Sequence, residues 1–375
     1  MKIGVLKESK SLENRIALTP DVVKQLVKKE FQVVIESGAG LNSFYSDSDY
    51  LAAGASIETS KSAVCASDVV LKVNALSLEE AKEMKDGSYC ISLLYAYTQP
   101  ELLDVLNSKK ITAFAMDAVP RISRAQKMDA LSSQANLAGY KSVILAADAL
   151  GKIFPLMMTA AGTITPSKVL IFGAGVAGLQ AIATAKRLGA VVEVSDVRIE
   201  TKEQVESLGG RFLSVEGADE VKTEGGYAKE VSADFLQKQK ELIETKIKDA
   251  DIVITTALVI GKRSPLLVTE DMVKSMKPGS VIVDMAVEWG GNCALSEKDK
   301  TVEKYGVKII GESNLPSLLP VNASQLYATN ISTLLQHLAT KEGFKLEMDE
   351  EITKGSMITH QGEVVHEFTK SILSK

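Results

Sequence analysis

Three glycines spaced as Gly173-x-Gly175-x-x-Gly178 are the residues of this 375-residue chain best suited to ligand chemistry. They follow the apolar run 169–172, which predicts a buried strand, and they precede an alanine-rich helix expected over residues 179–188. In that setting Gly173 permits a tight turn, Gly175 lets the backbone approach a phosphate, and Gly178 lets the helix pack closely on the strand. Because the N-terminal amides of a helix attract anions, the spacing predicts a site for the pyrophosphate of a dinucleotide.

A carboxylate follows the glycines at the distance expected for dinucleotide binding. The apolar run 191–195 predicts the next strand, and it ends at Asp196, about 20 residues after the glycines. An acidic side chain there suits the two ribose hydroxyls of NAD and would repel the 2′-phosphate of NADP. Together these features predict an NAD site rather than a mere tight turn in a sheet. Its expected residues come from the glycine turn, the helix start and the end of the second strand: Gly173, Gly175, Val176, Ala177, Gly178, Asp196, Val197 and Arg198.

Composition excludes several other classes of protein. The chain is 45% apolar and 24% charged, as in soluble globular proteins, and its net charge of −5 leaves no basic stripe for nucleic acid. Cys65, Cys90 and Cys293 are far apart and show no ligand spacing, so neither disulfides nor a metal site is expected. The longest apolar window, residues 143–162, is interrupted by charges and a proline, and no signal peptide precedes the first strand. We therefore expect no direct membrane span.

Alternating strand and helix signals predict a second α/β unit ahead of the glycine turn. Strands are expected over residues 2–6, 31–35, 69–73, 90–95 and 111–115, and helices over 22–29, 77–84 and 100–107. Later, a helix over 323–338 should return the chain to the first domain, and residues 352–368 resemble a hairpin. The predicted fold is α/β, with two Rossmann-like doubly wound parallel-sheet domains, the second inserted into the first. The expected boundaries are 1–131 with 320–375 for the first domain and 132–319 for the second.

Two segments between predicted elements are rich in polar residues or glycine. The loop that begins at Pro120 contains two arginines and lies where the first domain hands over to the second, and ligands often bind between domains. Residues 209–229 contain three further glycines and show little periodicity. They predict a long mobile surface loop, and such loops are usually functional.

Several motifs together resemble the NAD(H)-binding domain I of proton-translocating NAD(P)+ transhydrogenase. They are Asn14–Pro20, Pro120–Gln126, Leu131–Tyr140, Met157–Thr163, the glycine fingerprint and Glu224–Glu230, and the resemblance covers essentially the whole chain. It implies a cytoplasmic homodimer that binds NAD(H), exchanges a hydride with NADP(H) on domain III, and associates peripherally with the inner membrane. A membrane domain II would couple the transfer to proton movement. Either domain I is a separate subunit here or the natural chain continues beyond residue 375.

The resemblance also implies roles for the polar loop. Arg121, Gln126 and Asp129 would hold the nicotinamide end of NAD(H), and Ser132 would hydrogen-bond to its carboxamide. Gln126 would set the ring angle, since hydride transfer between two nicotinamides requires orientation and no acid/base group. Without the resemblance, these residues would be interpreted as a solvated polar network.

Three further residues and a glycine are assigned by the same resemblance. Tyr227, directly after Gly226, would fold over the bound nucleotide, although such a tyrosine is otherwise usually a surface anchor. Ala257 and Leu258, after the strand that ends near residue 256, would line the adenosine side.

The chain also resembles alanine dehydrogenase, which shares the opening motif. Arg15 and Lys72 match the cationic pair that holds a keto acid in that family. Its catalytic histidine is missing, because Tyr95 stands five residues before Pro100, and a phenol of pKa near 10 is a poor acid/base at neutral pH. We therefore expect Arg15 and Lys72 to be structural and salt-bridged, with anion binding as the alternative. A nucleotide-sensing regulator or an inactive homologue is a third hypothesis.

Overall fold

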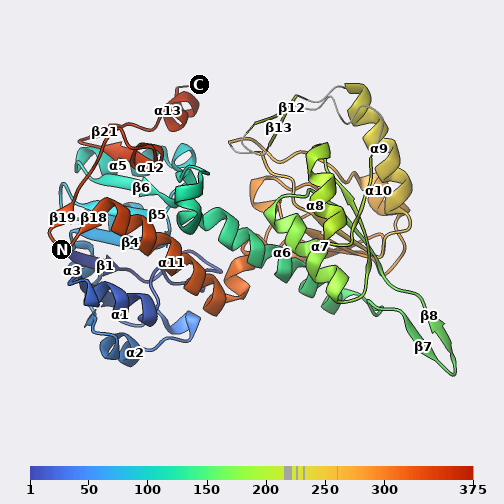
Figure 1. The fold of residues 1–375 in the computed structure, drawn as a ribbon, viewed down its shortest axis with the longest axis horizontal. Coiled ribbons are helices and arrows are strands. Elements are labelled where there is room, and N and C mark those ends of the chain that lie inside the picture. Colours follow the sequence, from blue (N-terminus) through green and yellow to red (C-terminus); the bar gives the residue numbers. More distant parts are fainter. Residues whose placement is uncertain (215–221, 225–226, 231–232, 260, 375) are drawn as a thin grey trace. The chain divides into compact units, whose positions relative to one another are not determined.

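The computed structural model describes residues 1–214, 222–224, 227–230, 233–259 and 261–374 (Figure 1). The chain forms two compact units, Met1–Gln134 with Ser317–Lys375 and Ala135–Pro316. The second unit is inserted into the first in the chain, as predicted. The long helix α6 (Ala130–Ala149) carries the chain from the first unit into the second.

The described residues of the first unit form an eight-stranded sheet in the order β21-β20-β6-β5-β4-β1-β2-β3. The strands from β6 to β3 are parallel and follow the 3-2-1-4-5-6 order of a Rossmann sheet. Two antiparallel strands extend the β6 edge, so the sheet is mixed there. The strands are β1 (Lys2–Val5), β2 (Gln32–Glu36), β3 (Ser56–Glu58), β4 (Val69–Asn74), β5 (Tyr89–Leu93), β6 (Thr112–Ala115), β20 (Met357–His360) and β21 (Glu363–Val364).

Alternating apolar side chains of these strands supply a hydrophobic core on each face of the sheet. Val33 and Ile35 enter one core, whereas Val34 between them enters the other. The helices of this unit are α1 (Pro20–Lys28), α2 (Asp47–Ala52), α3 (Lys61–Cys65), α4 (Leu78–Glu83), α5 (Pro100–Ser108), α11 (Pro320–Leu338), α12 (Glu351–Ser356) and α13 (Glu367–Leu373). The hairpin expected over 352–368 is correct only for β20 and β21, because the preceding residues form α12.

The described residues of the second unit repeat the same topology in a seven-stranded sheet, β11-β10-β9-β14-β15-β17-β16. All neighbours are parallel except β16, which is antiparallel at the edge. The strands are β9 (Lys168–Phe172), β10 (Val191–Ser195), β11 (Arg211–Phe212), β14 (Ile252–Thr255), β15 (Val281–Asp284), β16 (Thr301–Lys304) and β17 (Val307–Ile310). The helices are α7 (Val176–Arg187), α8 (Lys202–Ser207), α9 (Ala233–Ile247) and α10 (Glu270–Ser275).

Two short antiparallel pairs accompany this sheet. The first is β7 (Met157–Thr159) with β8 (Gly162–Ile164), which Figure 1 shows projecting from the second unit. The second is β12 (Lys222–Glu224) with β13 (Tyr227–Glu230). Residues 209–229 were expected to be a loop without regular structure, which is wrong for β11, β12 and β13. Residues 215–221 and 225–226 of that segment lie outside the described residues.

The strand order reverses between β1 and β4 in the first unit, and charged side chains of the chain itself fill this point. Glu8, after β1, accepts hydrogen bonds from the amide of Val73 at 2.6 Å and from Nδ2 of Asn74 at 3.0 Å. The same Asn74 nitrogen donates to Glu13 at 2.9 Å. Glu13 in turn holds the Arg15 guanidinium in a two-point ion pair at 2.7 and 2.6 Å. An internal hydrogen-bond network therefore occupies the point where a doubly wound sheet would bind a ligand.

Lys72 is neutralised in the same way. Its ammonium lies 2.7 Å from Glu80, a buried carboxylate that also caps α4 through the amide of Ser77 at 2.8 Å. Arg15 makes a further bond, donating to Oε1 of Gln134 at 2.9 Å. The expectation that Arg15 and Lys72 are salt-bridged within the first domain is confirmed.

Removing the Glu13 carboxylate should destabilise the first unit. Burial alone would raise the pKa of Glu13, but the Arg15 guanidinium lowers it to about 2. Glu13→Gln would leave Arg15 buried without its ionic partner, a change that typically costs about 3–5 kcal/mol. Because the folded-state pKa is depressed, the carboxylate stabilises the fold fully above about pH 4.5 and loses this contribution as the pH falls toward 2.

Denaturant unfolding of wild type and Glu13→Gln at a series of pH values measures this effect. The difference between their free energies of unfolding should be constant near neutral pH and should narrow below about pH 4.5. Asp86→Asn is the matched control, because Asp86 pairs with Lys109 at 2.8 Å at an exposed position and should matter little. Equal losses in the two variants, or a difference independent of pH, would contradict the prediction.

Candidate nucleotide-binding site

The glycine turn after β9 is packed so closely that two of its glycines are required by the protein itself. Gly173 has φ of +98°, and a Cβ placed on it would lie 2.3 Å from Oγ1 of Thr256. A Cβ on Gly178 would lie 1.9 Å from the carbonyl oxygen of Gly173. These contacts are the tight turn and the close helix packing that the spacing predicts. They fix the start of α7 against the ends of β9 and β14.

Gly175 differs, because nothing in its surroundings demands a glycine. Its φ of −76° suits any residue, and no atom of the described residues lies within 4 Å of a Cβ built there. It is the N-cap of α7, and no described side chain caps this helix start. The first-turn amides of Val176, Ala177 and Gly178 therefore point toward the space in front of Gly175. Such a cradle has the geometry and the partial positive charge that a phosphate requires.

Asp196 follows β10 and ties that strand to the glycine turn. Its carboxylate is 9% exposed and accepts the amide of Ala174 at 2.6 Å. Arg198 supplies three more hydrogen bonds, from its backbone amide at 2.8 Å, Nε at 2.9 Å and Nη2 at 2.7 Å. Since a carboxylate has about four acceptor positions, these bonds fill them. A further donor can reach this carboxylate only by replacing one of these four bonds.

The third wall of the site is the segment after β14, the strand next to β9. Thr256 donates to the carbonyl oxygen of Phe172 from its amide at 2.9 Å and from its hydroxyl at 3.0 Å. Ala257 and Leu258 follow, and Leu258 is 40% exposed. The strand order reverses between β9 and β14, where doubly wound sheets bind ligands. The structure thus brings the glycine turn, Asp196 and the Ala257 segment together.

The polar loop belongs to the first unit. Arg121 and Gln126 are exposed, and Gln126 lies in the 3₁₀-helix η4 (Ser123–Met128). Asp129 accepts the amide of Ser132 at 2.8 Å and its hydroxyl at 2.6 Å. This is the pattern of a helix N-cap, so Asp129 and Ser132 together define the start of α6.

Asn330 on α11 holds this loop in place and was missed by the sequence analysis. Its amide nitrogen donates to the carbonyl oxygen of Lys127 at 2.8 Å, and its oxygen accepts from Ser133 at 2.7 Å. Asn330 is 203 and 197 residues from these two partners in sequence, and an asparagine within a helix gives no sign of a distant contact.

Two predicted residues fall at the edge of what the structure describes. Tyr227 begins β13, and its backbone is placed there. Gly226 lies outside the described residues. Their assigned roles over the nucleotide stay predictions.

Tyr95 lies in a left-handed turn at the end of β5, with φ of +45°. Asp117 holds this turn, accepting the amide of Leu94 at 2.6 Å and that of Tyr95 at 3.1 Å, and burial raises the pKa of Asp117. The three histidines of the chain are engaged elsewhere: His337 with Glu350, His360 with Thr112 and His366 with Thr369.

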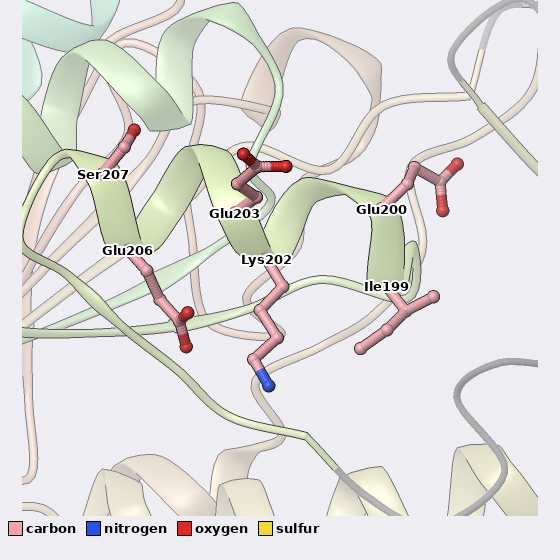
Figure 2. A pocket seen from close by; sticks show the side chains of 6 residues that line it. All are labelled: Ile199, Glu200, Lys202, Glu203, Glu206 and Ser207. Atoms are coloured by element: carbon pink, nitrogen blue, oxygen red, sulfur yellow. The ribbon is translucent and has the colours of Figure 1, made fainter.

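An open hollow lies along α8, next to Arg198 in the sequence. It is lined by Ile199, Glu200, Lys202, Glu203, Glu206 and Ser207, and Figure 2 shows Lys202 between Ile199 and Glu206. Three carboxylates against one ammonium would repel a phosphate, so this hollow is a poor anion site. Over the described ranges, no group of three His, Cys, Asp or Glu side chains could hold a metal ion. Nor does any helix there have the length and apolar character needed to cross a membrane.

Comparison with known proteins agrees with this geometry. Residues 4–138 match the family Alanine dehydrogenase/PNT, N-terminal domain, and residues 142–367 match Alanine dehydrogenase/PNT, C-terminal domain. The chain is 50% identical over 376 residues to an NAD(P) transhydrogenase subunit alpha protein of Rhodospirillum rubrum, and the match covers 98% of each chain. It is 31% identical over 376 residues to the alanine dehydrogenase of Bacillus subtilis, and that match covers 98% of this chain and 93% of the other.

A solved structure gives the same result. The crystal structure of a transhydrogenase from Sinorhizobium meliloti matches with a TM-score of 0.89 at 44% identity, covering 97% of this chain and 100% of that one. The resemblance to transhydrogenase, with alanine dehydrogenase more distant, is confirmed. Both halves of the chain match, and the identity extends over nearly its whole length, so the protein belongs to the alanine dehydrogenase/PNT family.

Proposed function

We propose that this chain is the NAD(H)-binding component of a proton-translocating transhydrogenase. It would exchange a hydride between its own NAD(H) and NADP(H) on a partner domain. The observation that carries this proposal is Gly175, where the protein itself needs no glycine and the uncapped start of α7 faces the space in front of it. The identity of 50% to a transhydrogenase subunit supports the assignment within the family.

The second unit would hold the adenosine half of NAD(H). The first-turn amides of α7 would bind the pyrophosphate, and Asp196 would bind the ribose once the Arg198 side chain gives up one of its hydrogen bonds. Val197 lies between Asp196 and Arg198 in the sequence. Ala257 and Leu258 would line the adenosine side. The charge of Asp196 would disfavour the 2′-phosphate of NADP.

The polar loop of the first unit would hold the nicotinamide half. NAD(H) supplies the hydride, and the chain supplies only orientation. Arg121, Gln126 and Asp129, with Ser132 at the start of α6, would fix the ring, and Tyr227 would close over it. Two hydrogen bonds support this role, because both restrain the loop. One is the N-cap bond from Ser132 to Asp129, and the other runs from Asn330 to the carbonyl oxygen of Lys127.

The partners proposed are a second copy of the chain, an NADP(H)-binding domain III and a membrane domain II. Together they would place this chain on the cytoplasmic side of the inner membrane. Exposed apolar side chains at Leu156, Met157, Met158 and Ile164 on and beside the β7–β8 hairpin support a protein interface there.

Light scattering of the purified chain should give twice the mass of one chain. A monomer at all concentrations would exclude the homodimer.

Alanine dehydrogenase is less well supported. Arg15 and Lys72 are each neutralised by a buried carboxylate, Glu13 and Glu80, so neither is available to bind a keto acid without breaking an ion pair. Tyr95 stands in place of the acid/base histidine. A binding-only regulator would keep the same nucleotide contacts but would show no transfer.

The test of this function is one assay with defined additions. Purified chain, an NADH analogue and NADP⁺ are monitored with and without the NADP(H)-binding domain of a transhydrogenase, and pyruvate with ammonium is added last. We expect hydride transfer only when that domain is present, and no response to pyruvate and ammonium. Binding of NADH without transfer would favour the regulator, whereas NADH oxidation by pyruvate and ammonium alone would identify an alanine dehydrogenase.

Gly175→Ala should weaken nucleotide binding while leaving the fold intact. No described atom would meet the new methyl group, so the melting temperature should fall only by the small cost of alanine at a helix N-cap, but the methyl group would stand where the phosphate binds. We expect the Kd for NADH, measured by calorimetry, to rise at least ~10-fold. Gly178→Ala is the contrasting variant, because its methyl group would lie 1.9 Å from a carbonyl oxygen and should lower the melting temperature. Unchanged NADH affinity in Gly175→Ala would refute the proposed phosphate site.

Gln126→Asn should slow hydride transfer with little loss of affinity. Shortening this exposed side chain by one methylene would displace its amide by about 1 Å, and a misplacement of that size can cost on the order of 10²-fold in rate. Single-turnover transfer to an NADP⁺ analogue on the partner domain measures the rate, and calorimetry measures the affinity for NADH. A large loss of affinity with a normal rate would show that Gln126 does not set the ring orientation.

A further inference from the structure

Asn292 is fully buried and has every polar atom of its side-chain amide engaged. Its oxygen accepts the amide of Ala257 at 3.0 Å. Its nitrogen donates to the carbonyl oxygens of Ala257 at 2.9 Å and Pro265 at 2.8 Å. The side chain therefore hydrogen-bonds to both main-chain groups of Ala257 and to the carbonyl group of Pro265, which lies further along the segment after β14. Only an amide of this length can accept at one atom and donate twice at the other.

The backbone amide of Asn292 is in turn held by the carboxylate of Asp284, at the end of β15. Both carboxylate oxygens accept the amide of Asn292, at 3.1 and 2.9 Å, and one also accepts that of Cys293 at 3.0 Å. Gly291 makes this approach possible, because its φ is +75° and a Cβ there would lie 2.7 Å from Asp284 Oδ2. Thr255 adds a bond to the same carboxylate at 3.1 Å.

These contacts end at the nucleotide site described above. Ala257 directly follows Thr256, whose hydroxyl oxygen would lie 2.3 Å from a Cβ on Gly173. A buried chain of hydrogen bonds therefore runs from Asp284 through Asn292 to the main chain beside the glycine turn. The hydrogen bonds of Asn292 join it to Ala257, Pro265 and Asp284, so its influence on binding would pass through Ala257.

We propose that Asn292 is a positioning residue that holds the Ala257 main chain against the glycine turn and thereby sets the affinity for the adenosine end of NAD(H). The inference rests on the proposed function. Asn292→Asp keeps the shape of the side chain but places a carboxylate oxygen against two carbonyl oxygens, which should push the Ala257 segment away. Asn292→Ala removes the grip without adding charge. Asn322→Asp is the matched control, because Asn322 is exposed on α11.

The experiment compares three ligands and one rate. Calorimetry with NADH, ADP-ribose and reduced nicotinamide mononucleotide separates the adenosine end from the nicotinamide end. In Asn292→Asp and Asn292→Ala we expect the Kd for NADH and for ADP-ribose to rise by the same factor, at least ~10-fold, with no change for the mononucleotide. With the partner domain, KM for NADH should rise while kcat at saturation stays within about twofold. Asn322→Asp should match wild type.

The single tryptophan, Trp289, reports the local fold, because its carbonyl oxygen accepts the amide of Ser264 at 2.9 Å in the same region. In Asn292→Ala its emission should stay near that of the wild type, whereas the melting temperature should fall, because three main-chain groups lose this partner, with the protein still folded at the assay temperature. The proposal fails if Asn292→Ala binds NADH and ADP-ribose as wild type does. It also fails if kcat and mononucleotide affinity fall in step with loss of folding, since Asn292 would then be merely structural. If the wild-type chain itself does not bind NADH, the proposed function fails instead, and the two failures are thus distinct.

Discussion

Two close backbone approaches, at Gly173 and Gly178, are the constraint on which the nucleotide-binding half of this chain depends. A side chain at either position would meet another atom at 2.3 or 1.9 Å, so β9, α7 and the end of β14 can come together only with glycine there. That packing directs the first-turn amides of α7 toward the space in front of Gly175. Asp196 then joins the end of β10 to the turn through the amide of Ala174. The phosphate cradle is thus a consequence of tight packing around it.

The two units share one strand order but use it in opposite ways. In the first unit the reversal point between β1 and β4 is occupied by carboxylates and their cationic or amide partners, namely Glu8, Glu13, Arg15 and Asn74. In the second unit the equivalent point has a glycine turn with no described atom near the missing Cβ of Gly175. Since the topology is the same, the difference between the two reversal points lies in their side chains, and on the proposed function it would place the phosphates of NAD(H) in the second unit.

The ion pairs of the first unit also affect which of two reactions, reduction of a keto acid or hydride transfer between nicotinamides, this unit suits better. Proton transfer to a keto acid needs a cation that can bind it and an acid/base group, and here Lys72 is paired with Glu80 and Tyr95 is held in a left-handed turn by Asp117. Hydride transfer between two nicotinamides needs neither. On the proposed function it would need an oriented loop, and the hydrogen bonds from Ser132 to Asp129 and from Asn330 to Lys127 would help to hold that loop. The first unit is therefore better suited to orientation than to acid/base catalysis.

Local sequence determined the fold class, the inserted arrangement and the position of the glycine turn, because strand and helix periodicity and the demands of Gly173 and Gly178 act over a few residues. It did not predict β11, β12, β13 or α12, which are short and have weak local signals. Only tertiary structure decided that Arg198 fills the acceptor positions of Asp196 and that Asn292 and Asn330 grip distant loops. The side chains of Asn292 and Asn330 bond to residues 27 to 203 positions away in the chain, so their contacts depend on which elements pack together. Arg198 is only two residues from Asp196, but the direction of its side chain depends on the packing around both residues, and no spacing in the sequence records that.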